Sequence, residues 1–290
     1  MYLIIVNVLL AFIIVILCKK NITALGKIQS MSEKTFFLDV DSTLSSFESS
    51  ECNKAMVAYL KTIWATEVAE SYFDFFNHAQ LYHQGIETPQ GRAFEADLRA
   101  YPVTNLTGRQ QSFMYSRELY LKIIAKRNDI ELSDTQVNKA CEKYWKAFME
   151  SSRIYEDSIR FMKKIKNKFI AAGSDQRLMV KDGQLTYDPE HSKRLRMERT
   201  VAAGFLDYFP KSRIIIGDPN FKPSDEFWIE CLRAAKLKKP EDAVLVDDSV
   251  RVIQSAADFG FQCYMIDRKG GPKLRHNNVT SISSFDEIKD

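Results

Sequence analysis

Five short apolar runs, spread along the chain, constrain its fold more than any other feature of the sequence. Each is four to six residues long, is rich in Phe, Ile and Val, and is bounded by Gly, Asp or Ser. Helical patterns at Ser224–Ala235 and Val250–Phe259 separate the later runs. Continuous apolar strands that alternate with helices are typical of a parallel sheet buried on both faces. We therefore predict an α/β fold with strands at Thr35–Leu38, Lys168–Ala172, Arg213–Ile216, Ala243–Val246 and Phe261–Ile266.

One long interruption, residues 51–160, breaks this alternation directly after the first strand. It contains several helical patterns and no convincing strand. Such a block indicates a second, all-helical domain inserted into the α/β core. We expect its helices around 51–80, 110–127, 134–150 and 154–166, and a core composed of residues 34–50 and 161–290.

Residues 176–200, between the second and third predicted strands, are unusually polar for this chain. A turn is expected at Lys181-Asp182-Gly183, and a basic helix after Pro189. We interpret the stretch as a solvated connection without a chemical role.

The first eighteen residues form a separate apolar run, in which Tyr2 and Asn7 are the only polar side chains. As a helix the run would span about 27 Å, close to the roughly 30 Å of a bilayer's hydrocarbon core. Lys19 and Lys20 follow it, and positive charge favours the cytoplasmic side, so we predict an anchor at 1–18 with the rest of the chain in the cytoplasm. The alternative is a soluble cytoplasmic protein that starts at Met31.

Charge and cysteine content limit the classes of partner. The net charge is +3, and the first thirty residues hold three lysines and no acid, so residues 31–290 are formally neutral. Without a basic stripe, a nucleic-acid-binding surface is excluded. The five cysteines form no C-x-x-C pair, which favours reduced thiols in an intracellular compartment.

Acidic residues stand where two of the predicted strands end. The first strand leads into Asp39 and Asp41, which alternation places on the same side, and the fourth leads into Asp247 and Asp248. The carboxyl ends of parallel strands share one edge of a sheet, where ligands bind. Four carboxylates at one edge would repel one another unless a hard divalent cation such as Mg²⁺ lay among them.

A hydroxyl and an ammonium belong to the same constellation. Ser174 follows the second strand, and Lys222 precedes Pro223 and the helix that begins near Ser224. An Asp, a Ser or a Lys in such a place is often only a cap or a surface charge when it stands alone. Their joint occurrence, each at a strand end and in this order, points to a functional site.

In this order the residues resemble the four motifs of the haloacid dehalogenase (HAD) superfamily. Its first motif is similar to Asp39-Val40-Asp41-Ser42-Thr43, its second to Ser174, its third to Lys222 and its fourth to Asp247-Asp248-Ser249. The later segments resemble the phosphatase branch, and the helical insertion resembles that superfamily's C1 cap. The resemblance implies a Rossmann-like parallel sheet core with an inserted all-helical cap.

The resemblance also implies a role for each residue. Asp39 would be the nucleophile that forms an aspartyl-phosphate, and Asp41 the general acid that later acts as base. Ser174 and Lys222 would hold the oxygens of the transferred group. Mg²⁺ would lie between Asp39, the backbone carbonyl of Asp41 and Asp247, with Asp248 as an additional ligand.

Two positions bear on the reaction type. Dehalogenases of this superfamily lack an acid at the position of Asp41, because a halide leaves without a proton, so this residue favours phosphate esters. Asp175 stands where relatives often have Asn; it adds negative charge near the phosphate or caps the next turn. A phosphonatase would need a lysine from the insertion, and Lys54 and Lys61 are interpreted as plain helix surface.

The sequence is less specific about the substrate. Charge across 51–160 is nearly balanced, which favours a small phosphorylated metabolite: a sugar phosphate, phosphoglycolate or a nucleoside monophosphate. The aromatic residues between 72 and 83 are interpreted as core of the insertion rather than as a stacking platform. Two alternatives to a phosphatase are a phosphomutase of the same architecture and a phospho-accepting signalling module of the receiver type.

Overall fold

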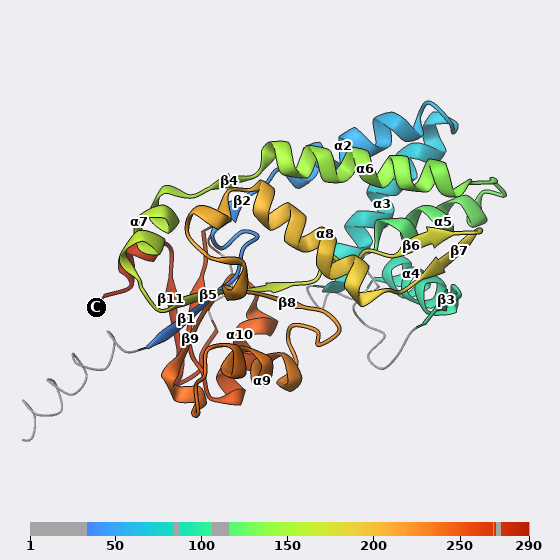
Figure 1. Cartoon of the computed structure of the whole chain (residues 1–290). Coiled ribbons are helices and arrows are strands. Elements are labelled where there is room, and N and C mark those ends of the chain that lie inside the picture. The colour runs from blue at the N-terminus through green and yellow to red at the C-terminus, as the bar shows by residue number, and fades with distance from the viewer. Residues whose placement is uncertain (1–33, 84–87, 106–115, 269, 271–273, 290) are drawn as a thin grey trace, which may run out of the picture.

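A computed structural model describes residues 34–83, 88–105, 116–268, 270 and 274–289 of the chain (Figure 1). The predicted anchor at 1–18 and the alternative start at Met31 lie outside these residues. Within the described ranges, every helix is too short or too polar to cross a bilayer.

A six-stranded sheet forms the centre of the α/β core, and every pair of neighbouring strands in it is parallel. Five of its strands agree with the five apolar runs to within one residue at each end, so the predicted parallel α/β fold is confirmed. The sixth strand, at the edge of the sheet, was not predicted, because its sequence VTSI has two polar residues between its apolar ends and is therefore not a continuous apolar run. Their order across the sheet is β11 (Val279–Ile282), β10 (Gln262–Ile266), β9 (Ala243–Asp247), β1 (Thr35–Leu38), β5 (Lys168–Gly173) and β8 (Ile214–Gly217).

Side chains of β1 show how the sheet is buried on both faces. Phe36 and Leu38 join one apolar cluster, whereas Phe37 joins the cluster on the opposite face, as a period of two requires. Phe36 packs edge-on against Phe161, with the ring centroids 5.3 Å apart. The first face is covered by α7 (Glu156–Lys164), and the second by α9 (Asp225–Ala234) and α10 (Val250–Phe259).

A largely helical block follows β1 and lies above the sheet in Figure 1. Two short antiparallel strands, β2 (Ser45–Ser46) and β4 (Arg153–Ile154), carry the chain into the block and out of it. The predicted helix at 51–80 is in fact two helices, because the chain turns after Leu60. The block consists of α2 (Ser49–Leu60), α3 (Thr66–His83), α4 (Pro89–Ala100), α5 (Arg117–Arg127) and α6 (Asp134–Ser151).

The prediction of a solvated connection at 176–200 is wrong. β6 (Met179–Lys181) and β7 (Gln184–Thr186) form a hairpin, whose Asp182 and Gly183 have the positive φ angles of a type I′ turn. The prediction of an insertion without strands is wrong too, because β3 (Val103–Thr104) pairs with β7. Leu185 is fully buried in the core of the helical block, so the hairpin is part of that block's structure.

Candidate functional site

The predicted site residues stand at the carboxyl edge of the central sheet. Asp39 directly follows β1, and its backbone N–H donates to the carbonyl of Val246 at 3.0 Å. This hydrogen bond continues the pairing of β1 with β9 and places Asp39 beside Asp247, the last residue of β9. Two adjacent buried strands thus bring the first and fourth motifs together.

Lys222 joins these two acids from the loop after β8. Its Nζ donates to Asp39 Oδ1 and to the backbone carbonyl of Ala171, both at 2.7 Å, and lies 2.5 Å from Asp247 Oδ2. The loop turns back closely at Gly217, where an added Cβ would lie 2.9 Å from the backbone nitrogen of Lys222. A residue larger than glycine would therefore displace the ammonium from the two carboxylates.

Three carboxylates converge beside this ammonium. Asp39, Asp247 and Asp248 each offer one oxygen, and the three oxygens lie within 4.8 Å of one another. The backbone N–H of Ser249 donates to Asp247 Oδ1 at 2.8 Å, and the hydroxyl of Thr43 lies 3.5 Å from Asp248 Oδ1. Three carboxylates face one ammonium, so the group has an excess of negative charge. Its ligand atoms are oxygens, which are the donors that suit Mg²⁺.

The pKa values of these acids reflect their burial first and the excess of negative charge second. Burial raises the pKa of Asp39 to about 7 in spite of the attraction of Lys222, and the charge of Asp247 adds to the rise. Burial, together with the charges of Asp247 and Asp39, raises the pKa of Asp248 to about 8. Burial alone would lower the pKa of Lys222, but its ion pairs with Asp247 and Asp39 raise it. A bound cation would stabilise the ionised form of both acids.

We expect the metal-free protein to lose stability as the pH rises from about 5 to about 8. In this range the folded chain keeps protons on Asp39 and Asp248 that the unfolded chain has lost, so the free energy of unfolding falls with rising pH. Urea unfolding in EDTA across this range measures the slope, and added Mg²⁺ should reduce it. A stability profile that does not change on adding Mg²⁺ would contradict the assignment of these acids as its ligands.

Replacing Lys222 should destabilise the protein strongly. Lys222→Met leaves Asp39 and Asp247 buried without a counter-charge, for which a loss of about 3–5 kcal/mol is expected. Urea unfolding in EDTA measures it. The control Lys211→Met, at an exposed position, should change the free energy of unfolding by no more than about 0.5 kcal/mol. Equal stability of the two variants would show that Lys222 does not hold the acids together.

Asp41 has partners that the sequence did not indicate. Its two carboxylate oxygens accept hydrogen bonds from Arg196 and Arg199 of α8 (Pro189–Ala202), at distances of 2.6 to 2.9 Å. The same two arginines bind Asp175, which is buried. We expected Asp175 to add negative charge near the phosphate or to cap the next turn; its charge is instead paired with Arg196 and Arg199. The spacing of three on a basic helix was the one signal in the sequence, because it places both arginines on one face.

Ser174 faces a different set of partners. Its hydroxyl donates to Asp218 Oδ2 at 2.7 Å, lies 2.7 Å from the hydroxyl of Ser192, and accepts the backbone N–H of Gln176 at 3.0 Å. Asp218 is buried, which raises its pKa, and also accepts a hydrogen bond from the Tyr187 hydroxyl. The structure thus joins Asp39, Lys222, Asp247 and Asp248 directly, whereas the hydrogen bonds described for Ser174 go to this neighbouring group.

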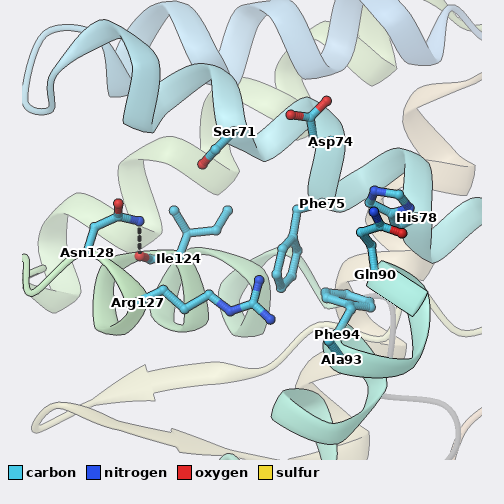
Figure 2. A pocket seen from close by; sticks show the side chains of 10 residues that line it. All are labelled: Ser71, Asp74, Phe75, His78, Gln90, Ala93, Phe94, Ile124, Arg127 and Asn128. Atoms are coloured by element: carbon cyan, nitrogen blue, oxygen red, sulfur yellow. Dashed lines mark hydrogen bonds between the residues drawn. The ribbon is translucent and has the colours of Figure 1, made fainter. Parts of the chain in front are cut away.

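A separate hollow of about 490 Å³ opens in the helical block, between α3, α4 and α5 (Figure 2). Phe75 and Phe94 pack edge-to-face in it with ring centroids 3.9 Å apart, and Tyr72 and Phe75 are buried. For these two residues the prediction of a core role is confirmed; the side chains of Tyr82 and His83 lie outside the description. The residues that line the hollow are Ser71, Asp74, Phe75, His78, Gln90, Ala93, Phe94, Ile124, Arg127 and Asn128, none of them from the acidic site.

Comparisons with known proteins agree with this architecture. A family model described as a haloacid dehalogenase-like hydrolase matches residues 33–260. The HAD-hydrolase YfnB from Bacillus subtilis, solved bound to magnesium, is 12% identical with a TM-score of 0.53, and the match covers 88% of this chain and 96% of that one. A haloacid dehalogenase-like hydrolase from Xanthomonas campestris is 11% identical with a TM-score of 0.50 and 88% coverage of both chains. At such identities the solved structures support the fold alone, and a search of curated proteins found no match.

Proposed function

Because this chain belongs to the haloacid dehalogenase-like hydrolase family, we propose that it is a Mg²⁺-dependent phosphomonoesterase. The observation that carries the proposal is the convergence of Asp39, Asp247 and Asp248 beside Lys222. This convergence supports the proposal, because a carboxylate that could act as the nucleophile lies next to an ammonium and two further oxygen donors. The acid at position 41 favours a phosphate ester over a haloacid, because an alkoxide needs a proton on leaving and a halide does not.

In the first step Asp39 attacks the phosphorus atom of the substrate. A bond forms between a carboxylate oxygen and phosphorus, and the bond from phosphorus to the ester oxygen breaks. Asp41 gives its proton to that ester oxygen, so the alcohol leaves neutral and Asp41 becomes a carboxylate. The products of the step are the alcohol and an aspartyl-phosphate on Asp39.

In the second step water attacks the phosphorus of the aspartyl-phosphate. Asp41 takes a proton from the water as the bond to phosphorus forms, and the bond between phosphorus and the Asp39 oxygen breaks. Inorganic phosphate leaves, Asp39 is again a carboxylate, and Asp41 again carries its proton. The cycle consumes one water and returns both acids to their starting state.

Lys222 and Ser174 complete the proposed phosphate site. Lys222 offsets the charge of Asp39, and by exchanging one of its three present contacts it can donate to the oxygens of the transferred group, which carry the charge of the transition state. Ser174 can do the same once its hydroxyl turns from Asp218 toward the crevice. Mg²⁺ held by Asp39, Asp247, Asp248 and the backbone carbonyl of Asp41 would let the two anions, carboxylate and phosphate, approach each other.

The helical block corresponds in this proposal to a cap of the C1 type, inserted after β1. In that role it would close over the crevice and select the substrate, a small phosphorylated metabolite such as a sugar phosphate, phosphoglycolate or a nucleoside monophosphate. Its nearly balanced charge in the sequence supports a substrate without a long polyanionic chain.

Release of inorganic phosphate from a panel of phosphorylated metabolites, with p-nitrophenyl phosphate as a general probe, tests the proposal. We expect phosphate release with Mg²⁺ on the general probe and on a subset of the panel. A phosphomutase would instead give an isomeric phosphate ester and little free phosphate. Stable phosphorylation of the chain without turnover would favour the receiver-type alternative.

A further inference from the structure

Asp41 is hydrogen-bonded to two arginines of α8, neither of which belongs to the four motifs. The Arg199 guanidinium uses two of its edges at once. Its Nε and Nη2 donate to Asp175 at 3.0 and 2.5 Å, and its Nη1 and Nη2 donate to Asp41 at 2.8 and 2.9 Å. Nη1 of Arg196 adds a bond of 2.6 Å to Asp41 and one of 3.0 Å to Asp175. Such paired contacts fix the direction of a carboxylate as well as its distance.

The exposed fractions of these four side chains show which of them form the fixed part of the cluster and which one reaches solvent. Only 4% of the Asp175 side chain, 3% of Arg196 and 8% of Arg199 are exposed, whereas Asp41 keeps 31%. Arg196 and Arg199 balance the charges of Asp175 and Asp41 when Asp41 is ionised, as it is after the first step, and removing the buried Asp175 would leave positive charge unpaired at a large cost. Asp175 is therefore the fixed partner of the arginines, and Asp41 is the member of the group that reaches solvent.

The two oxygens of Asp41 are not equivalent. Among the residues that the structure describes, Oδ2 accepts hydrogen bonds from both arginines, whereas Oδ1 accepts one, from the Nη1 of Arg199. A carboxyl oxygen has two acceptor sites, so Oδ1 keeps one for a further partner. In this arrangement Oδ2 anchors the side chain, and Oδ1 is the oxygen that can exchange a proton with a ligand.

The same guanidinium contacts the helical block. Its central carbon lies 4.3 Å from the ring centroid of Phe148 and 5.7 Å from that of Trp145, and both aromatic residues belong to α6. A hollow of about 320 Å³ lined by residues of α6 and α8 opens beside Arg199 and Asp175. Arg199 thus lies between α6 and the carboxyl edge of the sheet, in contact with both.

We infer that Arg199 is a positioning residue, which holds Asp41 in the direction needed for proton transfer and connects that direction to the packing of α6. The inference rests on the proposed function, because it assigns to Asp41 the proton that the ester oxygen takes up in the first step. Proton transfer requires hydrogen-bond distance to the leaving oxygen, so a small displacement of Asp41 lowers the rate. The effect should be largest for a substrate whose leaving group needs the proton most.

Two aryl phosphates of similar shape test this. p-Nitrophenolate leaves readily without a proton, whereas the phenolate of phenyl phosphate depends more on a general acid. We expect Arg199→Lys to lower kcat/KM for phenyl phosphate about tenfold more than for p-nitrophenyl phosphate, since part of a general-acid contribution of about 10²–10⁴ is lost. In the Asp41→Asn background the same change should have no further selective effect. Arg194→Lys, at an exposed position of the same helix, should alter neither substrate.

Equal losses on both substrates, or the same selective loss in the Asp41→Asn background, would overturn the inference. Inactivity of the unmodified chain on both aryl phosphates would overturn the proposed function, and the inference with it. If Arg199→Lys does not fold, the same comparison is made with Arg196→Lys. A lysine at this position can keep one of the two contacts of Nη1. We therefore expect a smaller loss of kcat/KM, again larger for phenyl phosphate than for p-nitrophenyl phosphate. An equal loss on both substrates would overturn the inference.

Discussion

Asp39→Asn is expected to abolish the hydrolysis of p-nitrophenyl phosphate, with a loss of about 10³-fold or more in kcat. An amide in place of the carboxylate cannot form the aspartyl-phosphate, although it keeps the shape of the side chain. Lys222 donates to Asp39 at 2.7 Å, so the nucleophile lies next to the group that offsets its charge. Initial rates with Mg²⁺ present measure the loss.

The fold of this variant should be unimpaired. Burial raises the pKa of Asp39, which means that the folded protein disfavours its charge, so a neutral amide should leave Tm unchanged or higher at neutral pH. Asp207→Asn, at an exposed position far along the chain, is the matched control and should keep full activity. Substantial turnover by Asp39→Asn would show that another group attacks the phosphorus.

Removal of divalent metal is expected to stop turnover entirely, and added Mg²⁺ to restore it. Without a cation, the carboxylates of Asp39, Asp247 and Asp248 repel both one another and an incoming phosphate. A second measurement does not depend on turnover: Mg²⁺ should raise Tm, because it binds the folded chain and not the unfolded one.

The metal prediction has its own controls. EDTA already saturated with Mg²⁺ should leave the rate unchanged, which separates chelation from a direct effect of the chelator. Asp248→Asn replaces one of the three carboxylates by a neutral amide and should weaken the shift of Tm by Mg²⁺. Full activity in metal-free buffer would contradict the assignment of the tandem Asp247-Asp248 to a metal.

Much of the fold could be predicted because the strands of a doubly covered parallel sheet are continuous apolar runs. Thr35–Leu38 is flanked by polar residues on both sides, so its bounds are visible in the sequence and match β1. The pairing of Asp39 with Asp247 followed from the same reasoning, since both stand where a strand ends. β11 could not be predicted by this reasoning, because it is an edge strand, which buries less of its surface.

The part of the site around α8 could not be predicted, and the reason is physical. Arg196 and Arg199 are buried although they are charged, because each is paired with Asp41 and Asp175. From its composition alone, such a helix is expected to be exposed to solvent. The ion pair between Arg199 and Asp41 joins residues that are 158 positions apart in the sequence. No local pattern shows a contact of that separation, so an interpretation based on polarity placed the helix on the surface.

The attachment of the helical block to the core determines which residues must be exchanged to replace this block with that of a related protein. Its two crossings, β2 and β4, are hydrogen-bonded to each other, so a transplanted block could enter through the same two-stranded stem without altering the order of the central sheet. The hairpin of β6 and β7, however, comes from the core segment after β5 and buries Leu185 within the block. A chimaera that exchanges only the residues between β2 and β4 would separate this leucine from the core that buries it and β7 from its partner β3. The natural unit of exchange is therefore the block together with its hairpin, two separate stretches of sequence that have to change as one.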